Sequence, residues 1–167
     1  QRQMCIRDRP YVILRPSNVF GHSMTNQSLF QLLKMIRQGV FFFIGEKDSV
    51  VNYIHVDDVV LALFECGINK NAIGNIFIIS QSTTVIKMVK SFLIGSNIDK
   101  NFIRLPEWVV RIISNFFILM PRFPLTTSRI NAFTGKCIYD SSKIKKNLNF
   151  EFKSTLEEHF TLFAKQK

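Results

Sequence analysis

Apolar residues occur along this chain in two patterns, continuous runs and helical stripes. The runs at residues 11–14 and 76–79 each lead directly into polar residues. Continuous runs of this length predict strands that are covered on both faces, as in a parallel sheet. Between them, apolar residues recur every three or four positions, which predicts amphipathic helices. Strands and helices that alternate in this way indicate an α/β fold.

The helical stripes place four principal helices. We expect them at 26–38, from 56 to about 67, from 83 to about 95, and from 154 to about 164. The first would bury Leu29, Leu32, Leu33 and Ile36 and end at Gly39. Asp57 is the expected N-cap of the second helix, with Val56, Val59, Val60 and Leu63 facing inward. Ser82 or Thr83 would cap the third, and Ser154 with Glu157 forms a capping-box pattern for the last.

Shorter elements fill the remaining segments. We expect strands at 40–44 and 50–55 as a hairpin or as neighbours, further short strands at 103–105 and 137–140, and short helices at 126–134 and 141–148. Residues 107–120 are apolar on nearly all sides and follow Pro106, which suits the start of a helix. At this length the segment cannot cross a bilayer, so a buried helix or a subunit contact is expected.

Composition and charge exclude several classes of protein. The formal net charge is +10, but the basic residues are scattered, and no nucleic-acid motif with the right spacing occurs. Cys5, Cys66 and Cys137 lie far apart and neither they nor the histidines have metal-ligand spacing, so reduced thiols in a cytoplasmic protein are expected. Residues 1–9 fit nothing downstream and resemble a translated adaptor-like scar, so we set them apart from the fold.

The polar turn after the first strand is the candidate site. Ser17, Asn18 and His22 follow residues 11–14, with Pro16 and Gly21 supplying turn geometry. In open α/β sheets, ligands bind in the crevice beyond the carboxyl ends of the strands. The alternative from pattern alone is an ordinary strand-to-helix loop that binds nothing.

Four motifs in this order resemble the C-terminal half of an NAD-dependent epimerase/dehydratase, an extended short-chain dehydrogenase/reductase. They are Arg15-Pro-Ser-Asn-Val-Phe-Gly21, Tyr53-Ile-His-Val-Asp-Asp-Val59, Gly74-Asn-Ile-Phe-Ile-Ile-Ser80 and Tyr139-Asp-Ser-Ser-Lys-Ile-Lys-Lys-Asn-Leu148. The resemblance covers about residues 11–165 and is specific for the superfamily rather than for a substrate.

The resemblance implies a fold and a division into domains. Residues 10–167 would be the C-terminal part of such an enzyme, in which 11–14 and 74–80 are the last strands of a Rossmann-type parallel sheet. Residues 26–55 and 100–167 would form the small α/β substrate-binding domain, which acts as a lid. The expected fold class is therefore α/β, with part of a parallel sheet and a substrate-binding domain.

The family's catalytic machinery is not found in this sequence. No glycine-rich dinucleotide fingerprint occurs. Tyr139 and Lys143 match the Tyr-x-x-x-Lys spacing but stand far beyond the family's position for that pair, so we interpret the match as coincidence. We assign no catalytic residue and expect the chain to be an inactive fragment of an NAD- or NADP-dependent parent.

Binding residues are carried over from the resemblance position by position. Pro16, Asn18 and Val19 would approach the cofactor, whereas Ser17, Asn18, His22, Asn52 and Arg129 would contact substrate. Asn18 matches the asparagine that in sugar-nucleotide epimerases binds the substrate diphosphate. Val51 and Asn52 stand where an arginine clamp is common, which puts a standard clamp in doubt, and Arg129 or Lys136 could supply the charge. We expect structural roles for His55 and Asp57.

The expected function is that of the substrate-binding half of a sugar-nucleotide epimerase/dehydratase. Two alternatives stay open: a reductase of a small ketone or sterol-like substrate, favoured by the missing arginine and by residues 107–120, and a non-catalytic binding or scaffold relative. The expected partner is a nucleotide sugar or other small molecule, without nucleic acid or a transmembrane segment, and with a homodimer for the intact parent.

Overall fold

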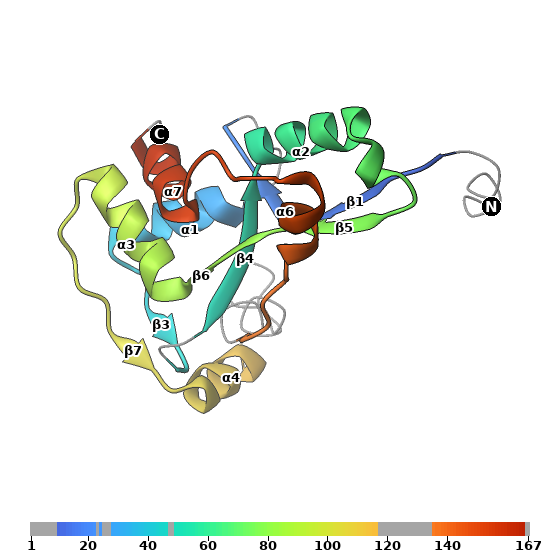
Figure 1. Cartoon of the computed structure of the whole chain (residues 1–167). Helices are drawn as coiled ribbons and strands as arrows, with labels where there is room; N and C mark the ends of the chain where they lie inside the picture. The colour runs from blue at the N-terminus through green and yellow to red at the C-terminus, as the bar shows by residue number, and fades with distance from the viewer. Residues whose placement is uncertain (1–9, 23, 25–27, 47–48, 117–134, 166–167) are drawn as a thin grey trace. The chain divides into compact units, whose positions relative to one another are not determined.

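The computed structural model describes residues 10–22, 24, 28–46, 49–116 and 135–165. The chain folds into two compact units that alternate along the sequence (Figure 1). Unit 1 consists of Gln1–Gly21, Asn52–Gln81 and Tyr139–Leu156, and unit 2 consists of His22–Val51, Ser82–Ile138 and Glu157–Lys167. The fold class is α/β with parallel strand pairs, as the sequence predicts.

Unit 1 contains the two strands that the apolar runs predict. β1 (Ile13–Pro16) and β5 (Ile76–Ile79) pair in parallel, with Ile13 opposite Ile76. β1 continues through Pro16, which tolerates this position because a strand at the sheet edge needs no donor on its outer side. Both strand predictions are confirmed, with β1 displaced by two residues.

Only one face of this strand pair is covered within the described residues. Phe77 and Ile79 are buried with residues of α2 (Val56–Ile68) and α6 (Ser142–Leu148) in one hydrophobic cluster. On the opposite face, the side chains of Ile76 and Ile78 are 39% and 42% exposed. The expected burial on both faces is therefore not observed here, and one apolar face of the sheet is bare.

A second parallel pair lies where the sequence predicted a loop. β2 (Asn18–Phe20) pairs with β4 (Val50–His55), with Asn18 opposite Tyr53, and β6 (Gln81–Thr84) is the third strand of that sheet. The turn predicted for residues 15–21 is wrong at these positions. Val19 and Phe20 have high strand propensity, and their pairing with β4 overrides the turn chemistry of Asn18.

Helix α2 forms as predicted, but its cap and inner face differ from the prediction. The Nδ1 atom of His55 accepts the backbone N–H of Asp57 at 3.3 Å, so His55 is the N-cap and Asp57 lies in the first turn. Asp58, Ala62 and Cys66 are the buried positions, and Val59 packs against the same core as predicted, whereas Val56, Val60 and Leu63 are exposed. The buried Asp58 is stabilised because its Oδ1 accepts the Lys153 N–H at 3.0 Å. A short 3-10 helix, Lys70–Ala72, follows α2.

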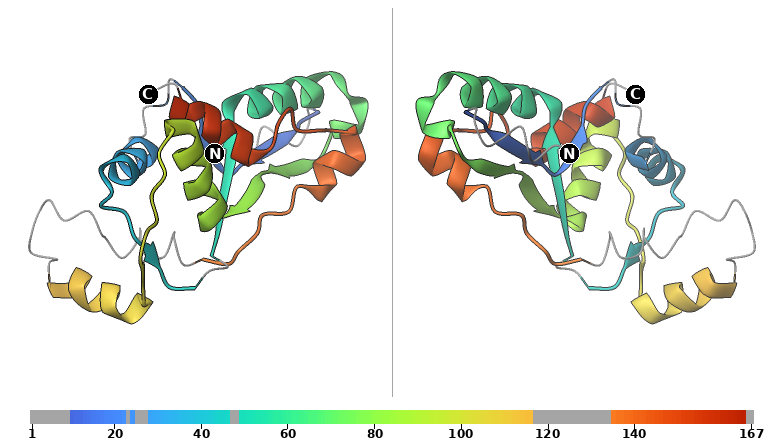
Figure 2. Two further views of the ribbon diagram at one scale, coloured as in Figure 1. Left: turned by 90° about the vertical axis from the view of Figure 1, so that its left-hand side faces the viewer. Right: turned by 90° about the vertical axis from the view of Figure 1, so that its right-hand side faces the viewer.

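The helices α1 (Ser28–Gln38), α3 (Val85–Ser96) and α7 (Leu156–Lys165) form the core of unit 2 (Figure 2). The predicted stripe of α1 is buried, and Gly39 ends that helix at φ 79°. Phe92 and Phe160 meet edge to face with ring centroids 5.2 Å apart. Arg37 joins all three helices because it donates to Ser96 Oγ at 3.0 Å and to the Ala164 carbonyl at 2.7 Å. The α3 cap is Thr84, not Ser82 or Thr83, which lie in β6.

The remaining elements of unit 2 correct the predicted hairpin. β3 (Phe43–Ile44) pairs in parallel with β7 (Arg104–Leu105), not with β4. Pro106 precedes α4 (Glu107–Phe116), in which Trp108 is 66% exposed and Val110 is buried. Within the described ranges, no helix is long and apolar enough to cross a membrane.

Two further predictions concern the C-terminal third. Residues 137–140 have no regular structure, so the predicted strand is wrong, whereas α6 confirms the helix expected after Ser141. Because α7 begins at Leu156, Thr155 rather than Ser154 precedes its first residue. The helix predicted at 126–134 and the first two residues of the helix predicted at 26–38 lie outside the described residues.

Candidate functional site

Polar residues of unit 1 gather beyond the carboxyl end of the β1–β5 pair. Ser17 follows β1, Ser80 follows β5, and the backbone N–H of Ser17 donates to the Ile79 carbonyl at 3.0 Å. Asn18 begins β2, and Asn52 lies in the neighbouring strand β4. We call this group, together with the segment 139–141, the strand-end site.

Asn18 and Asn52 connect the strand-end site to the C-terminal segment. The Asn18 Nδ2 donates to the Asn52 carbonyl at 3.2 Å, and the Asn52 Oδ1 accepts the backbone N–H of Tyr139 at 3.2 Å. The Asn52 side chain therefore orders residue 139. The Asn18 side chain is exposed, and its Oδ1 has no hydrogen-bond partner in the described part of the chain.

Ser141 closes the site from the other side. Its Oγ accepts the Ser80 N–H at 2.8 Å and donates to the Ser80 carbonyl at 2.9 Å, and both serines are buried. These contacts complete a closed ring of hydrogen bonds. In this ring Ser17 bonds to Ile79, Ser80 to Ser141, Tyr139 to Asn52, and Asn52 to Asn18. The ring holds together polar groups from four separate parts of the chain, at residues 17–18, 52, 79–80 and 139–141.

Two side chains in the ring have an oxygen atom that could still form a hydrogen bond with a ligand. The Oγ of Ser17 is buried and has no hydrogen-bond partner among the described residues. A buried hydroxyl without a partner costs free energy, so a ligand or water that bonds to it is stabilised. The exposed Oδ1 of Asn18, one residue away, is a second acceptor.

Electrostatics differ between the two ends of the site. Ser142 donates two hydrogen bonds to the Asp140 carboxylate, from its hydroxyl at 2.7 Å and from its backbone N–H at 2.8 Å. These bonds, of which the hydroxyl bond has the larger effect, lower the pKa of Asp140, so the carboxylate stays ionised. Tyr53 packs edge to face on the buried Phe20, and burial raises the pKa of its phenol. A phenol that holds its proton in this way cannot act as a base near neutral pH.

The structure brings together most of the residues that the sequence proposed. Pro16, Ser17, Asn18, Val19 and Asn52 all belong to unit 1 and lie within or next to the ring. His22 is exposed and is the first residue of unit 2, and Arg129 lies outside the described residues. The roles proposed for these residues remain predictions.

The sequence analysis did not identify Ser80, Ser141 or Asp140. Ser80 ends an apolar run just as Ser17 follows the first one, so the same strand-end reasoning could have found it. Ser141 was proposed only as the start of a helix, because nothing in a sequence shows that its hydroxyl reaches a residue sixty-one positions earlier.

Tyr139 and Lys143, which match the Tyr-x-x-x-Lys spacing, lie in different local structures. Tyr139 precedes α6 in irregular structure, whereas Lys143 lies within α6 and its ammonium is 5.4 Å from the centroid of the Phe77 ring. The two side chains do not share a helix face. In the described residues, no three His, Cys, Asp or Glu side chains gather as a metal site.

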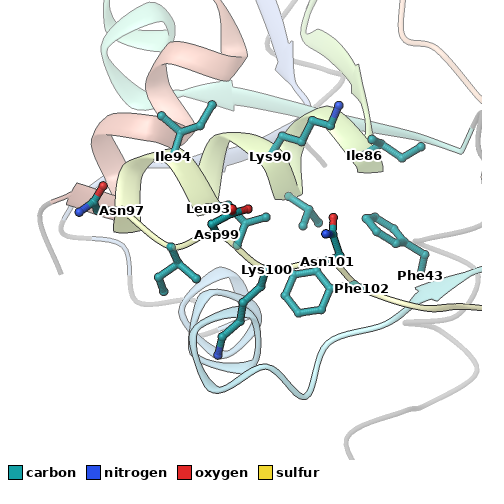
Figure 3. Close-up of a pocket in the computed structure, with 12 residues that line it drawn as sticks. Phe43, Ile86, Lys90, Leu93, Ile94, Asn97, Asp99, Lys100, Asn101 and Phe102 are labelled. Atoms are coloured by element: carbon teal, nitrogen blue, oxygen red, sulfur yellow. The ribbon is translucent and has the colours of Figure 1, made fainter.

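Unit 2 has a groove of its own, of about 640 Å³, between α3 and the segment 97–102 (Figure 3). Phe43, Phe102, Val89 and Leu93 give it an apolar floor. The Nζ of Lys100 bonds to the Arg37 carbonyl at 3.0 Å, so this lysine serves the packing of unit 2. Lys90 and Asp99 are the other titratable residues that line the groove.

Comparison with known proteins supports the fold. No protein-family model matches the chain, and no curated protein does. Among solved structures, UDP-glucose 4-epimerase from Thermotoga maritima, solved with UDP-glucose, matches with a TM-score of 0.62 and 24% identity over 98% of this chain and 48% of its own. dTDP-glucose 4,6-dehydratase from Bacillus anthracis, solved with NAD, matches with a TM-score of 0.57 and 16% identity over 92% and 43%.

A third structure is the enzyme WbmG from Bordetella bronchiseptica in complex with NAD and UDP. It matches with a TM-score of 0.61 and 15% identity over 93% of this chain and 43% of its own. The chain thus has the fold found in NAD-dependent epimerase/dehydratase structures and spans about half the length of these proteins.

Proposed function

We propose that this chain is the substrate-binding half of an NAD(P)-dependent sugar-nucleotide epimerase/dehydratase, and that the catalytic Tyr/Lys pair belongs to a part of the parent that this sequence does not contain. The strand-end site supports the proposal, because it sets unused polar groups beyond the carboxyl ends of a parallel strand pair. Solved structures with the same fold include proteins with bound UDP-glucose, UDP or NAD.

In this proposal Asn18 binds the nucleotide-sugar substrate. Its amide can donate a second N–H to a phosphate oxygen while the first holds the Asn52 carbonyl. Because that bond fixes the side chain before substrate arrives, less conformational entropy is lost on binding. Ser17 lies beside it and offers its buried hydroxyl to the same ligand.

The site also suits the nicotinamide end of the cofactor. Pro16 and Val19 are exposed beside the ring and offer apolar contact to a nicotinamide. NAD(P), when bound, accepts and returns a hydride. In the intact parent, Pro16 and Val19 would orient it and exclude water from its reactive face.

The exposed apolar face of the β1–β5 pair supports the proposal that this chain is part of a longer protein. Ile76 and Ile78 form an exposed apolar surface on a parallel sheet, and parallel sheets are covered on both faces in α/β proteins. We propose that a further helical layer of the parent covers this face.

A second candidate, a reductase of a small neutral ketone, is favoured by the charges at the site. The ionised Asp140 next to Tyr139 would repel a diphosphate, whereas it would not oppose a neutral ketone. A non-catalytic relative is the third candidate. The full reading frame of the parent separates it from the enzymes, because an enzyme of this class requires a Tyr-x-x-x-Lys pair.

Isothermal titration of the chain with UDP-glucose and with NAD⁺ tests the first proposal. Asn18→Ala should weaken UDP-glucose about tenfold, the effect of one lost charge-assisted hydrogen bond, and should leave NAD⁺ affinity within about twofold. Asn101→Ala, an exposed asparagine of unit 2, is the matched control and should change neither. If Asn18→Ala leaves UDP-glucose affinity unchanged, the first candidate is wrong.

A further inference from the structure

Helix α4 is apolar on two opposite sides, and one of them points away from unit 2. On the inner side, Val110 is buried in one cluster with Ile44 of β3. At 100° per residue, Trp108 and Ile112 lie on nearly the opposite side of the helix from Val110. Their side chains are 66% and 48% exposed. The burial that the sequence predicts for this helix therefore holds for its inner side alone.

A third exposed side chain extends the outer side of α4. The Ile103 carbonyl accepts the Phe43 N–H at 2.9 Å, so Ile103 continues the pairing of β7 with β3. It lies two residues before Leu105, on the strand face that packs against the α4 cluster, and it is 68% exposed. Figures 1 and 2 show α4 beside β3 and β7, apart from α1 and α7. We call Ile103, Trp108 and Ile112 the α4 apolar surface.

The charged residues of α4 lie at the edge of this surface. Arg111 donates from Nε and Nη2 to the Glu107 carboxylate, each at 2.7 Å. It is 100° from Val110 around the helix, between the inner and the outer side. A guanidinium has five N–H groups, so Arg111 can donate to a phosphate oxygen while it stays bonded to Glu107.

We propose that the α4 apolar surface binds the surface of a bilayer that contains anionic lipids, with Arg111 at the level of the lipid phosphates. Tryptophan favours this depth, because its ring is apolar and its indole N–H needs a polar partner. Lipids adapt to the convex side of a helix, whereas a protein partner would have to supply a matching pocket for Trp108. The net charge of +10 attracts anionic headgroups.

The length of α4 sets how it would lie on the bilayer. Its 10 residues span about 15 Å, against a hydrocarbon core of about 30 Å. The helix would therefore lie in the plane of the interface, with Trp108 and Ile112 inserted and Val110 still packed on its own unit. Binding through three side chains is reversible and depends on the lipid concentration.

Fluorescence tests the proposal at the surface itself, because Trp108 is the only tryptophan of the 167-residue chain. Vesicles of phosphatidylcholine with phosphatidylglycerol should shift its emission to shorter wavelength, and brominated acyl chains should quench it. Vesicles of phosphatidylcholine alone should require about tenfold more lipid for the same shift.

Matched variants separate this surface from the rest of the chain. In vesicle co-sedimentation, Ile112→Lys and Trp108→Ala should each weaken binding about tenfold or more, because each removes an inserted apolar group. Ile94→Lys, at a 68% exposed isoleucine of α3, makes the same change as Ile112→Lys outside the α4 apolar surface. It should alter binding by less than about twofold.

Several results would overturn the proposal. These are an unchanged Trp108 emission at millimolar lipid, an emission shift that brominated lipid does not quench, and equal losses from Ile112→Lys and Ile94→Lys. Vesicle binding without any change in Trp108 emission would mean that another surface inserts. Equal affinity for neutral and anionic vesicles would contradict the role of charge. Far-ultraviolet circular dichroism checks that each variant is folded, as exposed positions predict.

Discussion

The Oγ of Ser141 both accepts the N–H of Ser80 and donates to its carbonyl, at 2.8 and 2.9 Å. One hydroxyl thus satisfies the backbone of a buried residue that follows β5 and fixes the start of α6 against it. This pairing holds the strand-end site closed.

Ser141→Ala should destabilise unit 1 by about 1–3 kcal/mol, because the buried N–H and carbonyl of Ser80 lose their partner. Urea denaturation followed by circular dichroism measures the change. Ser142→Ala is the control, since the Ser142 hydroxyl bonds to the exposed Asp140, and it should cost less than about 0.5 kcal/mol. Equal losses from the two variants would contradict the role of Ser141.

Asn52→Ala should loosen the segment after residue 138, because the Tyr139 N–H loses its acceptor. Hydrogen exchange of the Tyr139 amide should then accelerate about tenfold, whereas Asn52→Asp keeps the oxygen and should preserve protection. If Asn52→Ala leaves the exchange rate of Tyr139 unchanged, the ring of contacts does not order this segment.

The pKa of Asp140 depends on Ser142. In Ser142→Ala the hydroxyl bond is lost, so the pKa should rise toward its ordinary value, as carboxyl nuclear magnetic resonance titration can measure. A carboxyl whose folded pKa is depressed stabilises the fold above its unfolded pKa, near 3.9, and loses that contribution as pH falls through the folded value. The pH dependence of stability below about pH 4 should therefore flatten in the variant. An unchanged Asp140 titration would contradict this assignment.

Two helical glycines should respond in opposite directions to alanine. A Cβ at Gly95 would lie 2.7 Å from the Ala164 Cβ and would also clash with the Thr161 carbonyl, so Gly95→Ala should cost about 1–3 kcal/mol by forcing α3 from α7. Gly67→Ala meets nothing and should stabilise α2 by about 0.5–1 kcal/mol through helix propensity. Thermal unfolding of dilute protein measures both, and a tolerated Gly95→Ala would disprove the close approach of these helices.

Local sequence patterns predicted much of the fold. The α1 stripe and the run at 76–79 were sufficient because burial there follows a simple period. The predicted inner face of α2 was right at Val59 and wrong at Val60 and Leu63, because both sides of the helix are apolar and local sequence does not show which side packs on the sheet. The parallel pairing of β3 with β7 joins segments far apart in sequence, and turn residues next to β3 carry no signal of it.

Part of the candidate site was also predicted from the sequence. Strand-end reasoning located Ser17 and Asn18, since carboxyl ends of parallel strands share one edge. The parts that it missed, Ser80 and Ser141, are joined by a side-chain contact between distant segments.

The central claim is that the strand-end site binds a nucleotide sugar through Asn18. Titration of ¹⁵N-labelled protein with UDP-glucose, followed by heteronuclear nuclear magnetic resonance, tests it most directly. The account predicts that the Asn18 side-chain amide and the backbone amides of Ser17 and Ser80 shift first and most, and that in Asn18→Ala the shifts of Ser17 and Ser80 require about tenfold more ligand. Shifts confined to the groove of unit 2, or no shifts with millimolar ligand, would contradict it.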